Sequence, residues 1–202
     1  MSKSKSRAVG FLLIGAGLFA VAVILPFGLS IYRTKLAIRA IEQIGGICHT
    51  EPGGPEWLRY WLGDTRIRLF DSVWQVDLSG TKATDEDVSR IAVFTKIRTL
   101  DLGDSRVTSH CLYHFRGLPD LALIHLNGSQ INDDGLEYLT LLPALAYLDL
   151  DNTSVTDKCL IYLKHCARLE CVSLEGTQLT EAGLEELQRF KPGLLDTGLD
   201  GK

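Results

Sequence analysis

Two aspartates, Asp77 and Asp101, are the first side chains whose type and spacing could perform chemistry. Each stands between two apolar residues of an alternating segment, and the two segments are 24 residues apart. If these segments are neighbouring strands, about 4.8 Å apart, the carboxyl groups approach the separation of about 5–5.5 Å that retaining glycosidases use. Such a pair also needs a cleft that gives the two carboxyl groups different pKa values, and an open strand surface provides none. We therefore expect no catalytic residue, and an enzyme that uses Asp77 and Asp101 is the least favoured alternative.

A second group with possible chemistry consists of His110, Cys111 and His114. The two histidines are four residues apart and could bind a metal from one side of a helix, but a stable zinc site needs three or four ligands. In the repeat described below, both histidines fall on the outer face of a helix. The sequence also contains no phosphate-binding loop, zinc-knuckle spacing, nucleophile elbow or Ser/His/Asp order. We expect no metal and no cofactor.

The five cysteines are odd in number and follow no regular spacing, which argues against a disulfide framework. Cys111 and Cys159 align with glycines in other copies of the repeat, and Cys166 aligns with large apolar residues. Cys166 is expected to be a small core residue, and Cys111 and Cys159 are expected at positions where a small residue fits the start of a helix. Cys171 is expected on an exposed surface, where it could react.

The elements that position these residues are copies of one repeat. From 73 to 192 the chain divides without a gap into five segments of 24 residues. In each copy two apolar residues stand two positions apart, which is the period of a half-buried strand. The two apolar columns are Val76, Leu100, Ile124, Leu148 and Val172, and Leu78, Leu102, Leu126, Leu150 and Leu174.

Polar columns follow each predicted strand. A hydroxyl group three residues after the last strand leucine can bond to the backbone of the turn. A second polar residue, three positions further on, is a good helix N-cap, and leucines at helical spacing then form the inner stripe of a short helix. The hydroxyl column is Thr81, Ser105, Ser129, Thr153 and Thr177, and the N-cap column is Thr84, Thr108, Asn132, Thr156 and Thr180.

The complete pattern, L-x-x-L-x-L-x-x-T-x-V-T-D-x-x-L-x-x-L, resembles leucine-rich repeats of the subclass with T-D-x-G-L turns, seen best in INDDGLEYL and LTEAGLEEL. The segments AIEQIGG, GPEWLRYWLGD and VWQVDLSGT resemble the start of single-span leucine-rich-repeat proteins of planctomycete bacteria. The resemblance implies an α/β solenoid, a curved parallel sheet backed by short helices, with an N-terminal transmembrane helix. It implies architecture more than activity, because most of that family lacks an assigned activity. The C-terminal tail, 193–202, departs from the pattern and shows no sixth repeat.

The amino-terminal part suits a lipid bilayer. Residues 9–31 carry no charge, and a helix of roughly 20 apolar residues spans a bilayer. The run is longer than the apolar region of a cleaved signal peptide, although Gly28 and Ser30 stand at the spacing of a cleavage site. We predict a basic tail over 1–8 and an uncleaved signal anchor over 9–31. The chain would then be a single-pass protein of a bacterial inner membrane.

The basic residues beside the apolar run barely indicate which side of the membrane the repeats face. Three basic residues precede the apolar run and three follow it closely, so the positive-inside rule almost ties. Unpaired cysteines favour a reducing compartment for the repeats. The short basic amino end favours the opposite placement, with that end inside and the repeats on the non-cytoplasmic side, and we adopt this second placement.

Residues 32–72 are predicted to form a juxtamembrane helix and an amino-terminal cap. Apolar residues at helical spacing precede a stop at Gly45-Gly46, and a second helix is expected after Pro55. A cap would cover the open edge of the first repeat, which repeat proteins need for solubility. Trp57, Trp61 and Trp74 are expected to pack in the cap or core, with an exposed binding patch as the alternative.

The exposed side of the strands, which we name the strand face, is the expected partner-binding surface and the concave side of such an arc. Residues 73–192 contain 18 acidic and 11 basic side chains. This balance argues against a nucleic-acid partner and favours a protein with a basic surface. The strand face is expected to present Asp77, Asp101, Leu123, His125, Tyr147, Asp149, Asp151, Cys171, Ser173 and Glu175.

The sequence thus predicts a membrane-anchored scaffold or recognition protein, and not an enzyme. A substrate adaptor or subunit of an enzyme complex is the alternative function. The helix side offers a competing surface. Its candidate residues are Arg90, His114, Tyr138 and Tyr162.

Overall fold

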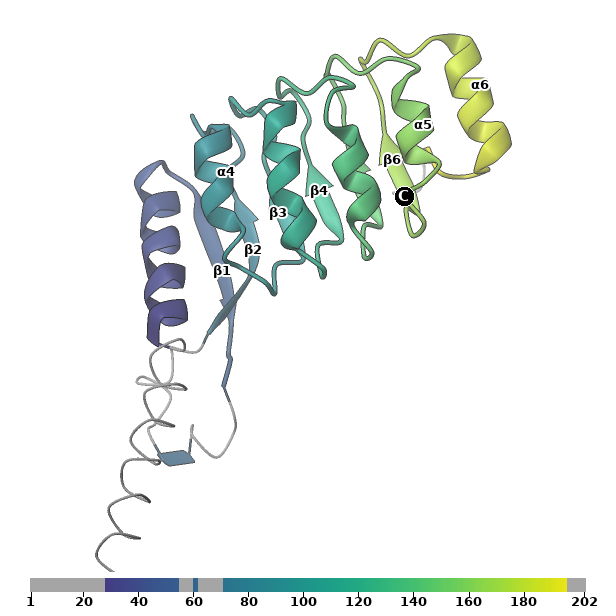
Figure 1. The fold of residues 1–202 in the computed structure, drawn as a ribbon. Coiled ribbons are helices and arrows are strands. Elements are labelled where there is room, and N and C mark those ends of the chain that lie inside the picture. The colour runs from purple at the N-terminus through teal and green to yellow at the C-terminus, as the bar shows by residue number, and fades with distance from the viewer. Residues whose placement is uncertain (1–27, 55–59, 62–70, 196–202) are drawn as a thin grey trace, which may run out of the picture. The chain divides into compact units, whose positions relative to one another are not determined.

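The computed structural model describes residues 28–54, 60–61 and 71–195 (Figure 1). Residues from Ala37 onward belong to one compact unit, and those up to Leu36 belong to another. The unit from Ala37 onward holds a six-stranded sheet in the order β1-β2-β3-β4-β5-β6. Its strands are β1 (Ile47–Glu51), β2 (Ser72–Asp77), β3 (Thr99–Asp101), β4 (Leu123–His125), β5 (Tyr147–Asp149) and β6 (Cys171–Ser173).

Strands β2 to β6 are parallel, and each pairs with the next at an offset of 24 residues, as in Leu100 with Ile124 and Leu148 with Val172. The middle residue of each three-residue strand is buried, and its two neighbours are less buried. This alternation follows from the pleat, which turns successive side chains to opposite faces. The parallel α/β arrangement predicted from the apolar columns is therefore present.

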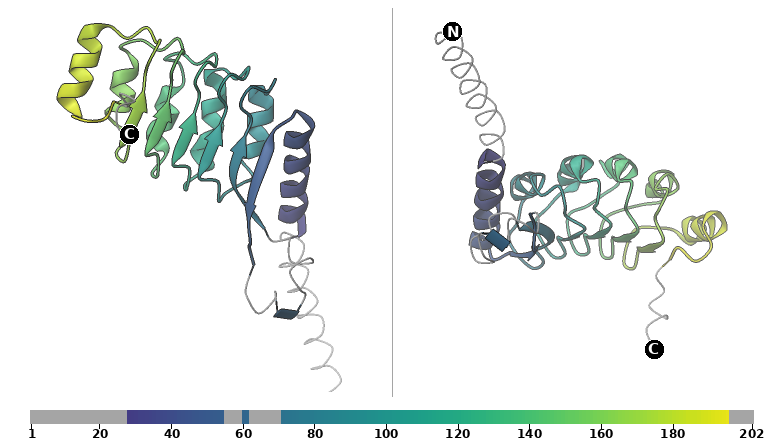
Figure 2. Two further views of the ribbon diagram at one scale, coloured as in Figure 1. Left: turned by 180° about the vertical axis from the view of Figure 1, so that it is seen from behind. Right: turned by 90° about the horizontal axis from the view of Figure 1, so that it is seen from below.

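One helical segment follows each of these strands, and all of them lie on the same side of the sheet (Figure 2). Thr84, Thr108 and Thr180 are N-caps, as predicted. The prediction is wrong for Asn132 and Thr156, because the segments in those two repeats begin later, directly after Gly135 and Lys158. The segments are α4 (Asp85–Ile91), the 3₁₀ helices η2 (Ser109–Gly117) and η3 (Leu136–Leu141), α5 (Cys159–Leu163) and α6 (Glu181–Phe190).

The core lies between the sheet and the helical segments. The two strand columns are buried along its whole length, together with helix residues such as Leu112 and Phe115. Cys166 is buried as predicted, and Cys111 and Cys159, expected at helix starts, are buried as well. Burial raises the pKa of the Cys159 thiol to about 12 and that of Cys166 to about 11, so neither is a thiolate at neutral pH.

The hydroxyl column closes the turn after each strand. Thr81 donates to the Leu78 carbonyl at 2.6 Å, and Thr153 donates to the Leu150 carbonyl at the same distance. Equivalent bonds are made by Ser105, Ser129 and Thr177. The prediction that these hydroxyl groups satisfy turn backbone is confirmed.

A second set of bonds joins consecutive repeats on the helix side. Asp133 accepts both the backbone N–H and the hydroxyl of Thr156, at 2.9 and 2.7 Å. Asp85 with Thr108 and Asp157 with Thr180 are bonded in the same way. These Thr–Asp bonds therefore connect three pairs of consecutive repeats, with the threonine of the later repeat bonded to the aspartate of the earlier one.

The remaining junction of this kind uses different residues. In the second repeat Ser109 replaces the aspartate, and in the third Asn132 replaces the threonine. The Ser109 hydroxyl donates to Asn132 Oδ1 at 2.7 Å and accepts the Asn132 backbone N–H at 2.9 Å. The two departures from the motif thus compensate each other.

The amino-terminal edge of the sheet is covered by residues that precede the repeats. Residues 28–43 are helical, and from this helix Ala37 and Ile41 enter the core. Strand β1, which the sequence analysis did not predict, pairs antiparallel with β2. A bidentate ion pair joins Glu51 of β1 to Arg98, with N–O distances of 3.0 and 3.3 Å.

The carboxyl-terminal edge of the sheet is also partly covered. Leu195 forms a parallel bridge with Val172, and the Val172 N–H donates to the Leu194 carbonyl at 2.7 Å. The Lys191 ammonium donates to the Cys166 carbonyl at 2.8 Å. The chain therefore continues the sheet pairing for one residue pair beyond β6.

The predicted membrane span lies outside the described residues except for its last four positions, 28–31. Within the ranges that the structure describes, no helix is long and apolar enough to cross a membrane. The predicted basic tail, the positions of Trp57 and Pro55, and most of the C-terminal tail also lie outside these ranges.

Candidate functional site

The strand face collects side chains from all five parallel strands. Its central row runs Asp77, Asp101, His125, Asp149 and Ser173, because each of these residues pairs with the next across the sheet. The row beside it runs Gln75, Thr99, Leu123, Tyr147 and Cys171. The structure therefore brings together the residues that the sequence analysis assigned to this face.

The central aspartates are acceptors for the turns that follow their strands. Asp77 accepts the backbone N–H of Ser79 at 2.9 Å and its hydroxyl at 2.6 Å. Asp101 and Asp149 each accept the N–H of the residue two positions ahead, at 3.0 Å. Side chains held in this way have fixed positions on the face. The sequence analysis missed this turn role, which an aspartate directly before a turn could have indicated.

Two further acidic residues lie at the turn edge of the strand face. Asp151 accepts the backbone N–H of Glu175 from the next repeat at 2.7 Å. Glu175 itself is exposed. The carboxylates on this side therefore come from both the strands and the turns, and Asp151 joins two repeats.

His125 places a basic group inside the acidic row. Its Nδ1 is 3.6 Å from Asp149 Oδ2, and its ring centroid is 5.1 Å from that of Tyr147. The polar contact with Asp149 is the main cause of a raised His125 pKa, and the charges of Asp101, Asp149 and Asp77 also raise it, against a lowering by burial. The field of this face is consequently less uniformly negative than a count of its carboxylates suggests.

Leu123 and Tyr147 give the face an apolar centre. Leu123 is 39% exposed, which is high for a large apolar side chain on a strand. It stands opposite Tyr147 on the adjacent strand, and Tyr147 contacts the His125 ring. Cys171 of β6, which pairs with Tyr147 from the other side of β5, is half-buried.

Strand β1 extends the strand face beyond the first repeat. Ile47 stands opposite Asp77 and His49 opposite Gln75. A β-bulge leaves Trp74 as an extra residue of β2 between the paired residues Val73 and Gln75. Val73 and Val76, which flank the Trp74–Gln75 pair, are buried. Because a bulge re-aims the side chain at that position, Trp74 meets His49, with ring centroids 6.0 Å apart.

The tryptophan prediction is therefore only partly correct. Trp74 is half-buried and packs against a histidine of the preceding strand. Trp61 was expected to pack in the cap, but it is 79% exposed. That part of the prediction is wrong, because one apolar side at helical spacing does not ensure that another element lies against it.

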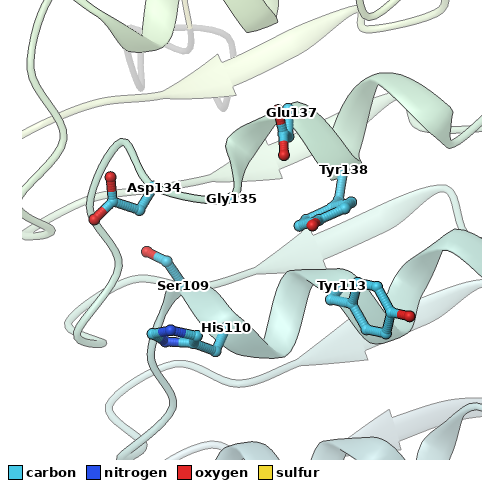
Figure 3. A pocket seen from close by; sticks show the side chains of 7 residues that line it. All are labelled: Ser109, His110, Tyr113, Asp134, Gly135, Glu137 and Tyr138. Carbon is cyan, nitrogen blue, oxygen red and sulfur yellow. The ribbon is translucent and has the colours of Figure 1, made fainter.

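The helix side carries a groove between η2 and η3 (Figure 3). Its cavity volume is about 390 Å³. A second groove, of about 380 Å³, lies on the other side of the segment that begins η3. The first groove is lined by Ser109, His110, Tyr113, Asp134, Gly135, Glu137 and Tyr138.

The histidines of the helix side do not assemble with Cys111. Cys111 is fully buried, and His110 Nδ1 lies 3.1 Å from the Thr108 hydroxyl. His114 is in edge contact with Tyr113. Across the described ranges, no group of three His, Cys, Asp or Glu side chains could hold a metal ion.

The comparison with known proteins gives limited similarity. No profile of a known protein family matches the sequence, and no curated protein matches it. Among solved structures, the mouse RP105/MD-1 complex is similar at 16% identity and a TM-score of 0.45, over 54% of this chain and 18% of that one. The leucine-rich-repeat protein LIC12759 of Leptospira interrogans is similar at 17% identity and a TM-score of 0.40, over 54% and 33%.

A third similar structure is the leucine-rich-repeat ectodomain of the receptor kinase SOBIR1 from Arabidopsis thaliana. It shares 13% identity at a TM-score of 0.41, over 73% of this chain and 95% of that one. The first two of these matches cover a third or less of the compared proteins. The leucine-rich-repeat fold of this chain rests on its own register, with one parallel strand and one helical segment every 24 residues.

Proposed function

We propose that this protein is a membrane-anchored recognition or scaffold module that binds a protein partner through its strand face. The observation that carries the proposal is the continuous surface formed by five registered strands, in which exposed Leu123 and the Tyr147–His125 ring pair are surrounded by carboxylates. Apolar and aromatic groups at the centre of a surface commonly supply most of the affinity, and charged groups around them supply specificity.

The turn bonds of the strand face support binding rather than catalysis. Asp77 and Asp101 already accept backbone N–H groups, so their carboxylates are held in place before a partner arrives. Fixing a surface in advance lowers the entropy that binding must overcome. We propose a non-enzymatic function, because an open strand surface provides no cleft that would give the Asp77 and Asp101 carboxyl groups different pKa values.

The proposed partner has a basic surface. Asp77, Asp101, Asp149 and Asp151 belong to this face, and His125 is the basic member of its central row. Opposite charge would speed encounter, and salt would screen the attraction over about 8–10 Å at ordinary ionic strength. The apolar centre would retain part of the affinity at high salt.

The membrane attachment is proposed from the sequence alone. The uncharged run 9–31 would span a bacterial inner membrane and place the repeats, proposed here to form a solenoid, on the non-cytoplasmic side. The resemblance to planctomycete single-span proteins with T-D-x-G-L repeats supports the same arrangement. Fractionation of membranes, followed by protease treatment of intact and opened cells, tests it.

The binding proposal is tested on the full-length protein purified in detergent. Asp101→Asn and Asp149→Asn remove charge while an amide oxygen can still accept the turn N–H, and Tyr147→Ala removes the aromatic centre. Asp120→Asn, at an exposed position in the loop after η2, is the matched control. Affinity capture from solubilised membranes should recover a basic partner with the wild type and the control, and less of it with the other three.

Binding of the recovered partner should then weaken as salt is raised. A partner that binds all four variants equally, or whose affinity does not change with salt, would show that the strand face is not the recognition surface.

A further inference from the structure

His125 is the one basic side chain in the central row of the strand face. In that row it lies between Asp101 on β3 and Asp149 on β5, with Asp77 one strand further on β2. Its Nδ1 is 3.6 Å from Asp149 Oδ2, which is the distance of an ion pair when the ring is protonated. Among the residues that the structure describes, no lysine or arginine forms an ion pair with these three carboxylates. The charge of the row therefore depends on one imidazole.

The groups that surround His125 favour its protonated form in the free protein. The polar contact with Asp149 is the largest influence that raises the His125 pKa, and the charges of Asp101, Asp149 and Asp77 add to it, while burial lowers it. The other neighbours are uncharged, because β5 adds the Tyr147 ring and β4 itself adds Leu123. The ring is consequently still partly protonated at a pH where an isolated histidine is mostly neutral.

Protonation of His125 weakens the negative field of the strand face at its centre. The central row has three carboxylates, Asp77, Asp101 and Asp149, and a protonated ring cancels one of their three charges. The cancelled charge lies between β3 and β5, beside the apolar centre. A basic partner would therefore meet a weaker attraction when the ring is charged.

The apolar centre gives a second reason for the same preference. The His125 side chain is 29% exposed, and its ring centroid is 5.1 Å from that of Tyr147. A partner group seated on Leu123 and Tyr147 would cover much of the remaining exposed part of the ring. Taking an imidazolium out of water costs more free energy than taking out a neutral imidazole. Repulsion by a basic partner and loss of water both favour the neutral ring in the complex.

We propose that protonation of His125 switches recognition at the strand face, which binds its basic partner while the ring is neutral and releases it as the ring becomes protonated. The switch rests on the proposed function and adds its regulation. Because the partner and the proton oppose each other, the effect is reciprocal. Acid weakens binding of the partner, and a bound partner makes His125 harder to protonate.

The first test measures affinity against pH with the full-length protein in detergent at low ionic strength. The probe is acetyl-Lys-Leu-Lys-Leu-Lys-amide, whose charge stays constant because lysine ordinarily titrates near about 10.4. Between about pH 8 and about pH 5.5, histidine is the side chain that ordinarily changes charge. Over this range the affinity of the wild type should fall about two- to fivefold, as expected for one partly exposed charge.

Two histidine variants show whether His125 causes this change. His125→Gln has no proton to gain, so the ratio of its affinities at the two pH values should be near one, whatever its affinity at the higher pH. His165→Gln removes an exposed histidine just beyond α5, on the helix side, and is the matched control. It should keep the wild-type ratio.

The second test measures the reciprocal effect on the wild type. The protein has five histidines, and labelling their Cε1 atoms with carbon-13 lets each titration be followed by NMR. The His125 resonance is the one that His125→Gln lacks. Saturating peptide should lower the midpoint of its titration by about 0.3–0.7 pH unit, which is the same factor as the change in affinity. The His165 midpoint should stay in place.

Equal pH dependence of binding in the wild type and His125→Gln would overturn the switch. So would a His125 midpoint that the peptide leaves unchanged or raises. If Asp101→Asn and Tyr147→Ala still weaken peptide binding in that case, the strand face binds a basic partner and only its regulation is wrong. A peptide that the wild type does not bind even at the higher pH would contradict both the basic partner and the switch.

Discussion

At the scale of single residues, the strand face shows side chains with two roles at once. Asp149 accepts the Asp151 N–H and contacts His125, so it shapes a turn and sets a charge. From the sequence, Asp149 was expected to contribute only to the acidic surface. Its neighbour Leu148 is fully buried, as the alternating pattern predicted.

We predict that Leu148→Asp unfolds the repeats, at a cost of more than about 4 kcal/mol, because it places an unpaired charge in the core. Asp149→Ala should cost about 1 kcal/mol, the typical value of one hydrogen bond. Asp149→Asn should cost less than Asp149→Ala, because the amide oxygen can still accept the turn N–H. Chemical unfolding of the three variants measures this order, and equal losses for positions 148 and 149 would contradict the strand register.

The raised pKa of His125 predicts a pH dependence of stability. A histidine whose pKa is higher in the folded than in the unfolded state stabilises the fold fully below its unfolded pKa, near 6.5. That contribution is lost as the pH rises through the folded value. Because the His125 side chain is 29% exposed, we expect a contribution of about 0.5–1 kcal/mol.

Thermal unfolding between pH 5.5 and about 8 checks this expectation. The His125→Gln variant should lose part of the stability that the wild type gains at the acidic end. The variant and the wild type should converge at the alkaline end. Parallel curves throughout the range would mean that His125 has no raised pKa in the folded protein.

At the scale of elements, the junctions between repeats depend on the Thr–Asp bonds. We predict that Thr156→Val and Asp133→Asn are coupled by about 0.5–1.5 kcal/mol in a double-mutant cycle, because each side chain satisfies the other. Unfolding free energies of the two single variants and the double variant measure the coupling. Thr95→Val, an exposed threonine in the loop after α4, is the control and should be additive with Asp133→Asn.

The strands were more predictable than the helical segments. The apolar columns at 76, 100, 124, 148 and 172 depend on a local period, and every one of them is buried. The starts of η3 and α5, directly after Gly135 and Lys158, could not be placed in the same way. Asn132 and Thr156 have side chains typical of N-caps. In the structure, however, they accept the N–H groups of Asp134 and Lys158 in a turn that precedes the helical segment.

Contacts between distant segments were the least predictable. Strand β1 has few apolar residues of its own, and it forms because the edge of β2 provides backbone partners. The groove between η2 and η3 depends on the relative starts of two helices, which no single repeat specifies. On the strand face, the sequence predicted which residues gather but not the turn bonds that hold the aspartates.

At the scale of the whole repeat unit, the amino-terminal edge of the repeat sheet is covered and the carboxyl-terminal edge is partly covered. Gly46 allows the first helix and β1 to approach the core closely, since a Cβ there would stand 2.5 Å from a Leu78 methyl group. We predict that a chain beginning at Lys35 folds and stays monomeric, whereas one beginning at Trp74 aggregates. The second chain lacks Ala37, Ile41 and β1, and therefore exposes core side chains and an unpaired strand edge.

Light scattering and circular dichroism of the two chains decide the point. Ile41→Asp in the longer chain separates the roles of the helix and the strand, because it removes helix packing while β1 remains. If the shorter chain is monomeric and equally stable, residues 35–73 do not act as a cap.

The Thr–Asp bonds, the Ser109–Asn132 bonds and the strand pairing join each repeat only to the next, and this has a mechanical consequence. A protein tethered at one end and pulled at the other carries the load through these junctions in series. We expect it to give way one repeat at a time, starting at the carboxyl end, where a single bridged pair and Lys191 secure the last strand. Each rupture would release one repeat, or about 80 Å of extended chain, and the tether would lengthen in equal steps.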